Sequence, residues 1–171
     1  MPAAGFFLNN EMDDFATAPG KPNLFGLIQG EANAVGAGKR MLSSQSPTIA
    51  WRGDGSEVIA VGGRGGSRIP TATLQILLGV LVDHDSLQAA VDRPRIHHQW
   101  RPDRIYYETD ALSPETRAAL SALGHQLEEA PRGIAQAHAV RFLRQEGGAR
   151  CEAAADPRGG GGSGAIARAW P

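Results

Sequence analysis

The chain has 171 residues, of which 42% are hydrophobic, and this length and apolar content suffice for a buried core and exclude disorder throughout. Its 17 basic and 18 acidic residues give a formal net charge of -1, so no basic excess favours nucleic acid as a partner. The single Cys151 cannot form an internal disulfide bond, and the longest apolar stretch, residues 74–82, is much shorter than the ~20 residues of a membrane span.

The first half of the chain mixes short β-favouring runs with irregular stretches. Residues 5–8 suit a buried strand that ends in a polar loop. Residues 16–41 contain many glycines and prolines with little periodicity, which predicts a long irregular connection. Residues 46–51 and 57–61 are β-favouring runs joined by Arg52–Ser56, which predicts a hairpin.

Helix signals follow in the second half. The apolar spacing of residues 69–82 predicts a buried helix with Pro70 in its first turn. Asp85 and Ser86 open a second helix that ends before Pro94, and a third begins at Ser113–Glu115 and stops at Gly124. Residues 135–143 and 149–153 predict a closing hairpin, and Gly159–Gly162 indicate a flexible end.

Three carboxylates lie within four residues near the start of the chain, at Glu11, Asp13 and Asp14. Clustered carboxylates in a half-buried loop favour a bound cation, either a metal ion or the ammonium group of a ligand. The stretch lacks the alternating oxygen ligands and the glycine of an EF-hand calcium loop. A solvated acidic loop is the alternative interpretation.

The glycine cluster Gly62–Ser67 lies between a predicted strand and a predicted helix, where backbone amides converge on an anion or a developing oxyanion. It lacks the Gly-Lys-Ser/Thr ending of a phosphate-binding P-loop, and a tight strand-to-helix turn is the alternative interpretation. Ser43 and Ser44 offer two hydroxyl groups to a carboxylate. Carboxylates, hydroxyls and glycine amides together suit the head group of an amino acid.

Two further polar motifs carry less information. His97 and His98 lack a ligand-like spacing, so we predict no metal site. Asp156–Arg158 is interpreted either as an ion-paired structural turn or as a support for the site, and the structural interpretation is favoured.

In this order the motifs resemble the small, C-terminal subunit of the gamma-glutamyltransferases, also called gamma-glutamyltranspeptidases or glutathione hydrolases. The resemblance runs from about residue 5 to about residue 160, and the matching stretches are Phe7–Phe15, Lys39–Thr48, Gly65–Ile69, Pro94–Trp100 and Asp156–Arg158. We therefore expect residues 1–160 to form a partial small-subunit domain and residues 161–171 to form an atypical flexible tail.

The resemblance implies an α+β fold of the N-terminal nucleophile hydrolase type, an αββα sandwich in which an exposed threonine is the nucleophile and its own α-amine is the base. It also implies roles for residues of this chain. Glu11 and Asp14 would hold the α-ammonium of the gamma-glutamyl group, and Ser43 and Ser44 its α-carboxylate. The amides of Gly65 and Gly66 would form the oxyanion hole.

The same resemblance implies an incomplete enzyme. We expect the nucleophile, the strands that carry it and the large subunit to lie outside this chain, so that the chain alone is inactive. Expected partners are gamma-glutamyl compounds such as glutathione, the large subunit and the upstream small-subunit segment; no cofactor is implied. Family members suggest a periplasmic or extracellular location, with any signal on the upstream part.

Two features depart from the family pattern. Gly63 and Arg64 replace the usual Ser-Pro before the glycine pair, which loosens the loop and places a cation beside the expected oxyanion hole. The ending differs from the usual one with a terminal tyrosine. The alternative from a different functional class is a non-catalytic protein, either a truncated relic or a module that binds an amino acid or a partner.

Overall fold

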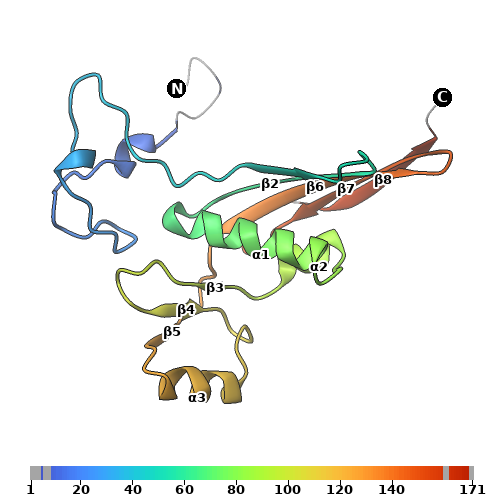
Figure 1. Cartoon of the computed structure of the whole chain (residues 1–171). Coiled ribbons are helices and arrows are strands. Elements are labelled where there is room, and N and C mark those ends of the chain that lie inside the picture. Colours follow the sequence, from blue (N-terminus) through green and yellow to red (C-terminus); the bar gives the residue numbers. More distant parts are fainter. Residues whose placement is uncertain (1–4, 6–8, 160–161, 170–171) are drawn as a thin grey trace. The chain divides into compact units, whose positions relative to one another are not determined.

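The computed structural model describes residues 5, 9–159 and 162–169 (Figure 1). The chain divides into two compact units, residues 1–43 and 44–171, and each is described on its own. The first unit contains two short 3-10 helices, η1 (Glu11–Asp14) and η2 (Glu31–Asn33). The rest of residues 16–41 is irregular, as predicted. Of the strand expected at residues 5–8, Gly5 is a turn residue with a φ of 69°, and residues 6–8 lie outside the described residues.

The second unit contains a five-stranded antiparallel sheet with the order β1-β2-β6-β7-β8. The predicted hairpins are both present: β1 pairs with β2, and β6 pairs with β7 across a tight turn in which Gly147 has a φ of 77°. The strands of this sheet are β1 (Thr48–Trp51), β2 (Glu57–Arg64), β6 (Gln136–Gln145), β7 (Gly148–Ala155) and β8 (Gly164–Ala169).

Strand β8 differs from the flexible tail that we expected over residues 161–171. It pairs with β7 from Gly148–Ala169 to Ala153–Gly164 and forms the edge of the sheet. Without β8, one edge of β7 would expose a row of unpaired N–H and C=O groups. The glycines at 159–162 suggested a flexible end, but pairing along this edge orders residues 164–169 as a strand.

Two helices cover one face of the sheet (Figure 1). The 3-10 turn η3 (Gly66–Arg68) leads into α1 (Ile69–Leu81), and α2 (Leu87–Asp92) follows. The Ser86 hydroxyl accepts a hydrogen bond from the Ala89 amide at 3.2 Å, which caps α2 as predicted. No helix among the described residues has the length and apolar character needed to cross a membrane.

The remaining elements of this unit are a second, three-stranded sheet and a third helix. The sheet has the order β3-β4-β5, with β3 (Ile96–His97), β4 (Ile105–Tyr107) and β5 (Leu127–Glu129). Helix α3 (Pro114–Ala122) links β4 to β5, and the Ser113 hydroxyl accepts a hydrogen bond from the Thr116 amide at 3.1 Å. The predicted start of this helix is therefore confirmed.

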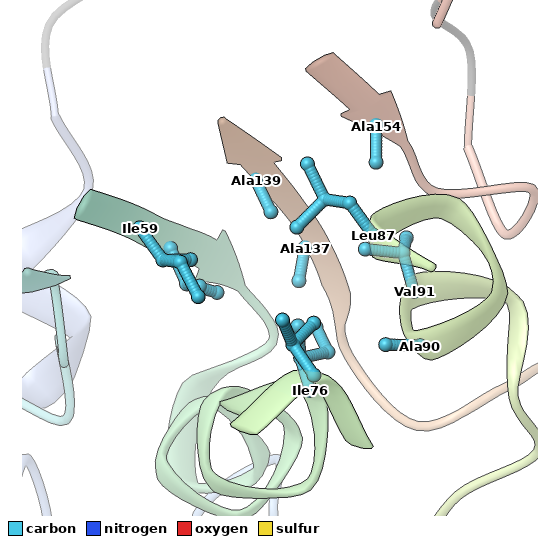
Figure 2. Packing of buried hydrophobic residues seen from close by; sticks show 10 residues of the cluster. Ile59, Ile76, Leu87, Ala90, Val91, Ala137, Ala139 and Ala154 are labelled. Carbon is cyan, nitrogen blue, oxygen red and sulfur yellow. The ribbon is translucent and has the colours of Figure 1, made fainter. Parts of the chain in front are cut away.

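The core lies between the large sheet and the two helices. Figure 2 shows side chains of β2, β6 and β7 meeting those of α1 and α2. Ile59 and Ile76 are completely buried at the centre of this contact. Small side chains on β6 and β7, Ala137, Ala139 and Ala154, let the helices approach the sheet closely.

The opposite face of the large sheet, here called the outer face, is also apolar. Its side chains alternate along each strand with those of the core, because neighbouring residues of a strand point to opposite faces. A hollow of about 450 Å³ lies on the described part of this face, and Val58, Ala60, Val140, Phe142 and Ile166 are among its lining residues. A sheet with two apolar faces is typical of a layer covered on both sides.

We predict that the isolated chain self-associates through the outer face. Trp51 and Val140 are 70% and 54% exposed there, and each apolar side chain fully buried by association contributes about 1.5–3 kcal/mol. The double change Trp51→Thr with Val140→Thr should shift the mass measured by size exclusion with light scattering toward the monomer. Leu123→Thr is the control, since Leu123 is 77% exposed next to α3. A wild-type chain that is already monomeric would contradict the prediction.

Candidate functional site

The acidic stretch of the first unit forms η1. The Glu11 amide donates to Asn9 Oδ1 at 3.2 Å, and the Asp13 amide donates to the Asn10 carbonyl at 3.0 Å. Glu11 and Asp14 are half-buried and share a side-chain hydrogen bond, whereas Asp13 is exposed. Burial raises the pKa of Asp14, and the charge and hydrogen bond of Glu11 raise it further. A proton or a bound cation reduces the repulsion between two carboxyl groups in this arrangement.

Asn33 ties this acidic turn to the end of the first unit. Its side-chain amide donates to the Asp14 carbonyl at 2.7 Å, and its Oδ1 accepts from the Leu42 amide at 2.9 Å. The segment that leads to Ser43 is thereby held to η1. Phe15 is buried behind the turn and Met12 is 60% exposed, so the apolar residues beside these carboxylates are only partly buried among the described residues. Phe6 and Phe7 lie outside the described residues.

The two predicted serines lie at the boundary between the units. Ser43 is exposed at the end of the first unit, and Ser44 is half-buried at the start of the second. The Ser46 hydroxyl donates to the Ser44 carbonyl at 3.3 Å, which supports the extended path into β1. The predicted site residues are thus divided between the units, and their convergence on one ligand stays a prediction.

The glycine pair of the second unit forms the turn between β2 and η3. Gly65 and Gly66 have φ values of 138° and 57°, which residues with a side chain rarely adopt. A Cβ atom on Gly65 would lie 2.7 Å from the Ala135 Cα, so glycine is also required by close packing. In the described part of the chain, neither amide N–H donates to an acceptor. Two adjacent free donors suit a developing oxyanion.

A hydrogen-bonded network stabilises the turn on its helical side. The Ser67 hydroxyl donates to Gln99 Oε1 at 2.7 Å, and His97 Nε2 lies 2.9 Å from the same oxygen. Because an amide oxygen only accepts, His97 Nε2 carries a proton. His97 Nδ1 lies 2.8 Å from the Thr71 hydroxyl in α1. Burial lowers the pKa of His97, and the nearby positive charges of Arg68 and His98 lower it further, whereas the Gln99 hydrogen bond opposes this shift.

His97 therefore has a structural role at the start of α1, which the sequence did not predict. Among the residues that the structure describes, no group of three or more His, Cys, Asp or Glu side chains could hold a metal ion.

Four charged side chains form a buried ion cluster that holds residues 134–137, the segment against which Gly65 packs. The cluster consists of Arg95, Glu108, Asp156 and Arg158. Asp156 Oδ2 accepts from Arg95 Nη2 at 2.8 Å and from the Ala137 amide at 2.7 Å. Glu108 accepts from the Arg95 amide at 2.9 Å, from the Ile134 amide at 2.5 Å and from the Arg158 guanidinium.

Both acids of this cluster are ionised in the folded chain. Burial by itself would raise the pKa of Asp156, but hydrogen bonds from Ala137 and Arg158 and the charge of Arg95 outweigh it and lower the pKa. The pKa of Glu108 is lowered in the same way by Arg158 and by the amides of Ile134 and Arg95. The predicted ion-paired turn at Asp156–Arg158 is confirmed by the Arg158 Nη1 to Asp156 Oδ1 contact at 3.0 Å. Because the cluster also holds residues 134–137, the turn supports the glycine pair as well.

Comparison with known proteins gives a consistent result. The family model described as gamma-glutamyltranspeptidase matches residues 1–166. The glutathione hydrolase proenzyme of Pseudomonas aeruginosa is 44% identical over 160 residues, which are 92% of this chain and 28% of that protein. The chain therefore spans little more than a quarter of the length of this relative.

Solved structures agree with the sequence matches. The crystal structure of a mutant Helicobacter pylori gamma-glutamyltranspeptidase superposes with a TM-score of 0.83 at 40% identity, over 93% of this chain and 84% of that chain. The transpeptidase enzyme CapD of Bacillus anthracis superposes with a TM-score of 0.60 at 27% identity, over 71% of this chain and 70% of that chain. The expected α+β fold is thereby confirmed.

We predict that Asp156→Asn destabilises the second unit by about 3–5 kcal/mol, because it removes one partner of a buried ion pair. The ordinary pKa of Asp156 is near 3.8 and its folded pKa is lower, so its stabilisation is complete well above pH 3.8 and is lost as the pH falls through the folded pKa. The stability difference between wild type and variant should therefore shrink in acid.

Urea unfolding measures this difference. It is carried out in the Trp51→Thr and Val140→Thr background, because that double change should reduce self-association. Asp103→Asn is the control, since the Asp103 side chain is 86% exposed. A difference of less than about 1 kcal/mol at neutral pH, the ordinary value for an exposed pair, would show that the cluster does not stabilise the unit.

Proposed function

We propose that this chain, which belongs to the gamma-glutamyltranspeptidase family, supplies the substrate-holding part of an enzyme that cleaves gamma-glutamyl amide bonds. The enzyme would take compounds such as glutathione and pass the gamma-glutamyl group to water, amino acids or peptides. The observation that carries this proposal is the pair of amides at Gly65 and Gly66, which have no acceptor among the described residues and lie in a glycine-only turn at the end of a strand.

The head group of the gamma-glutamyl donor is assigned to polar groups of complementary charge. Glu11 and Asp14 would bind its α-ammonium group. Burial and the neighbouring Glu11 raise the pKa of Asp14, which supports this assignment because a bound cation would stabilise the ionised carboxylates. The hydroxyls of Ser43 and Ser44 would donate to its α-carboxylate. This arrangement selects an acyl group that carries an amine and an acid on one carbon.

The chemical step would place negative charge on the acyl oxygen. A nucleophile attacks the acyl carbon, the π electrons of the carbonyl move to oxygen, and the amides of Gly65 and Gly66 donate to that oxyanion. Collapse of the intermediate restores the carbonyl and breaks the C–N bond, and the base passes the proton of the nucleophile to the leaving amine. Attack by water or by an acceptor amine then releases the acyl group from the nucleophile. We assign the nucleophile, a threonine in this family, and its base to residues outside this chain.

The outer face of the large sheet supports the assignment of the fold as an αββα sandwich. We infer that a second sheet packs on the outer face, which would place the present sheet and its helices in one half of an αββα sandwich. The apolar hollow of about 450 Å³ and the exposed Trp51 are the features that this second sheet would cover. The second sheet and the large subunit would come from the rest of the protein.

We predict that Asp14→Asn weakens donor binding. In the assembled enzyme, defined here as this chain co-expressed with the remaining segment of a longer relative, the variant should raise the KM for a chromogenic gamma-glutamyl anilide about 10–100-fold. That factor corresponds to the loss of one charge-assisted hydrogen bond of about 1.5–3 kcal/mol. Asp13→Asn is the matched control, because Asp13 lies in the same turn but is exposed. Equal effects of the two variants would contradict the assignment of Asp14.

We predict that Gly65→Ala abolishes most of the turnover. A Cβ atom at this position meets the Ala135 backbone and requires a φ that alanine rarely adopts, so the two amides would lose their alignment. Loss of one oxyanion donor lowers kcat about 10²–10³-fold. Gly53→Ala is the control, since a Cβ atom there meets nothing within 4 Å. Wild-type kcat in Gly65→Ala, measured with the same anilide, would refute an oxyanion hole at this turn.

A further inference from the structure

A polar hollow of about 410 Å³ lies where β2 runs into the glycine turn. Its lining residues are Gly62, Gly63, Arg64, Gln136 and His138. The register of the sheet pairs Gly62 with His138 and Arg64 with Gln136. The side chains of Arg64, Gln136 and His138 belong to the outer face. Their neighbours on β6, Ala137 and Ala139, are buried on the opposite face against the helices. The apolar outer face therefore ends in a polar site beside Gly65.

The position of Arg64 is fixed by its neighbours. Its Nε donates to Gln136 Oε1 at 2.7 Å, and the amide nitrogen of Gln136 lies 3.5 Å from His138 Nε2. Gly159 makes room for this amide, because a Cβ atom there would lie 1.8 Å from Gln136 Nε2. Gly63 lets β2 approach β6 at the same point, since its Cβ atom would lie 2.6 Å from the Gln136 carbonyl oxygen. The guanidinium is thus oriented by the packing of two strands and the loop after β7.

The terminal nitrogens of Arg64 remain available to a ligand. Within the described residues, no carboxylate forms an ion pair with Arg64 and neither Nη atom has an acceptor. By contrast, Arg141 on β6 and Arg52 in the turn between β1 and β2 pair with Glu57, and Arg150 on β7 pairs with Glu152. A guanidinium held through Nε presents two parallel N–H donors, which match the two oxygens of a carboxylate.

We propose that Arg64, supported by Gln136 and His138, binds the carboxylate of the amine-bearing peptide that leaves or accepts the acyl group. This proposal rests on the proposed function, because it takes Gly65 and Gly66 as the amides that meet the acyl oxygen. Arg64 directly precedes Gly65, so its ligand belongs to a group near the reacting carbonyl. The α-carboxylate of the donor is assigned to Ser43 and Ser44, which leaves the carboxylate of the peptide on the other side of the scissile bond for Arg64.

Binding is tested without turnover by NMR. The assembled enzyme containing the 15N-labelled chain is titrated with glycylglycine and, separately, with its C-terminal amide, which lacks the carboxylate. We expect glycylglycine to shift the amide signals of Gly62, Gly63 and His138, and we expect the capped peptide to leave them unchanged. Arg64→Ala should abolish the shifts. Arg144→Ala is the matched control, because Arg144 is an exposed arginine on the same face at the other end of β6.

Transfer kinetics with the same peptides give the second readout. Arg64→Ala should raise the KM for glycylglycine about tenfold, which is the lower end for a hydrogen bond to a charged group. Its KM for the capped peptide should not rise by the same factor, and Arg64→Lys should retain part of the affinity for glycylglycine.

Three results would overturn the proposal: unchanged signals with glycylglycine, equal shifts with both peptides, or an equal rise in KM for both. Absence of anilide cleavage in the wild-type assembly would refute the proposed function, and the NMR titration would still decide whether Arg64 binds a carboxylate.

Discussion

The glycine turn depends on charges that are buried behind it. Asp156 and Glu108 accept hydrogen bonds from the amides of Ala137 and Ile134, and Arg95 and Arg158 neutralise both acids. A buried charge that loses its partner costs several kcal/mol, so none of these segments can shift alone. The segment that they hold is the one against which Gly65 packs. The conformation of the turn is therefore set by electrostatics over a long sequence distance.

The two faces of the large sheet differ in what they contact within the second unit. Its inner face packs on α1 and α2 through small and branched side chains, and its outer face carries an apolar hollow that ends in the polar site around Arg64. The change from apolar to polar residues occurs where β2 reaches the glycine turn. Under the proposed function, this distribution would place the chemistry at one end of the sheet and leave the rest of the outer face for packing.

Local features were predictable from the sequence, and features that depend on distant contacts were not. The hairpin between β1 and β2, the caps at Ser86 and Ser113 and the buried helix α1 follow from turn residues, capping hydroxyls and apolar spacing. Strand β8 was missed because only its pairing with β7 orders it. The partnership of Arg95 with Asp156 spans 61 residues and leaves no local pattern. The acidic cluster and the glycine cluster stand out in the sequence and their roles stay predictions, whereas the close contact of Gly65 with Ala135 required the fold.

The central proposal is that this chain recognises an amino-bearing acyl group. The most direct test compares the hydrolysis of a gamma-glutamyl anilide with that of the corresponding glutaryl anilide, which lacks only the α-amino group, in the assembled enzyme. Recognition of the α-ammonium group by Glu11 and Asp14 predicts that kcat/KM for the gamma-glutamyl compound exceeds that for the glutaryl compound by about 10²-fold or more, since the charge-assisted contacts of both carboxylates are lost. Equal values, or a preference for the glutaryl compound, would contradict the proposal.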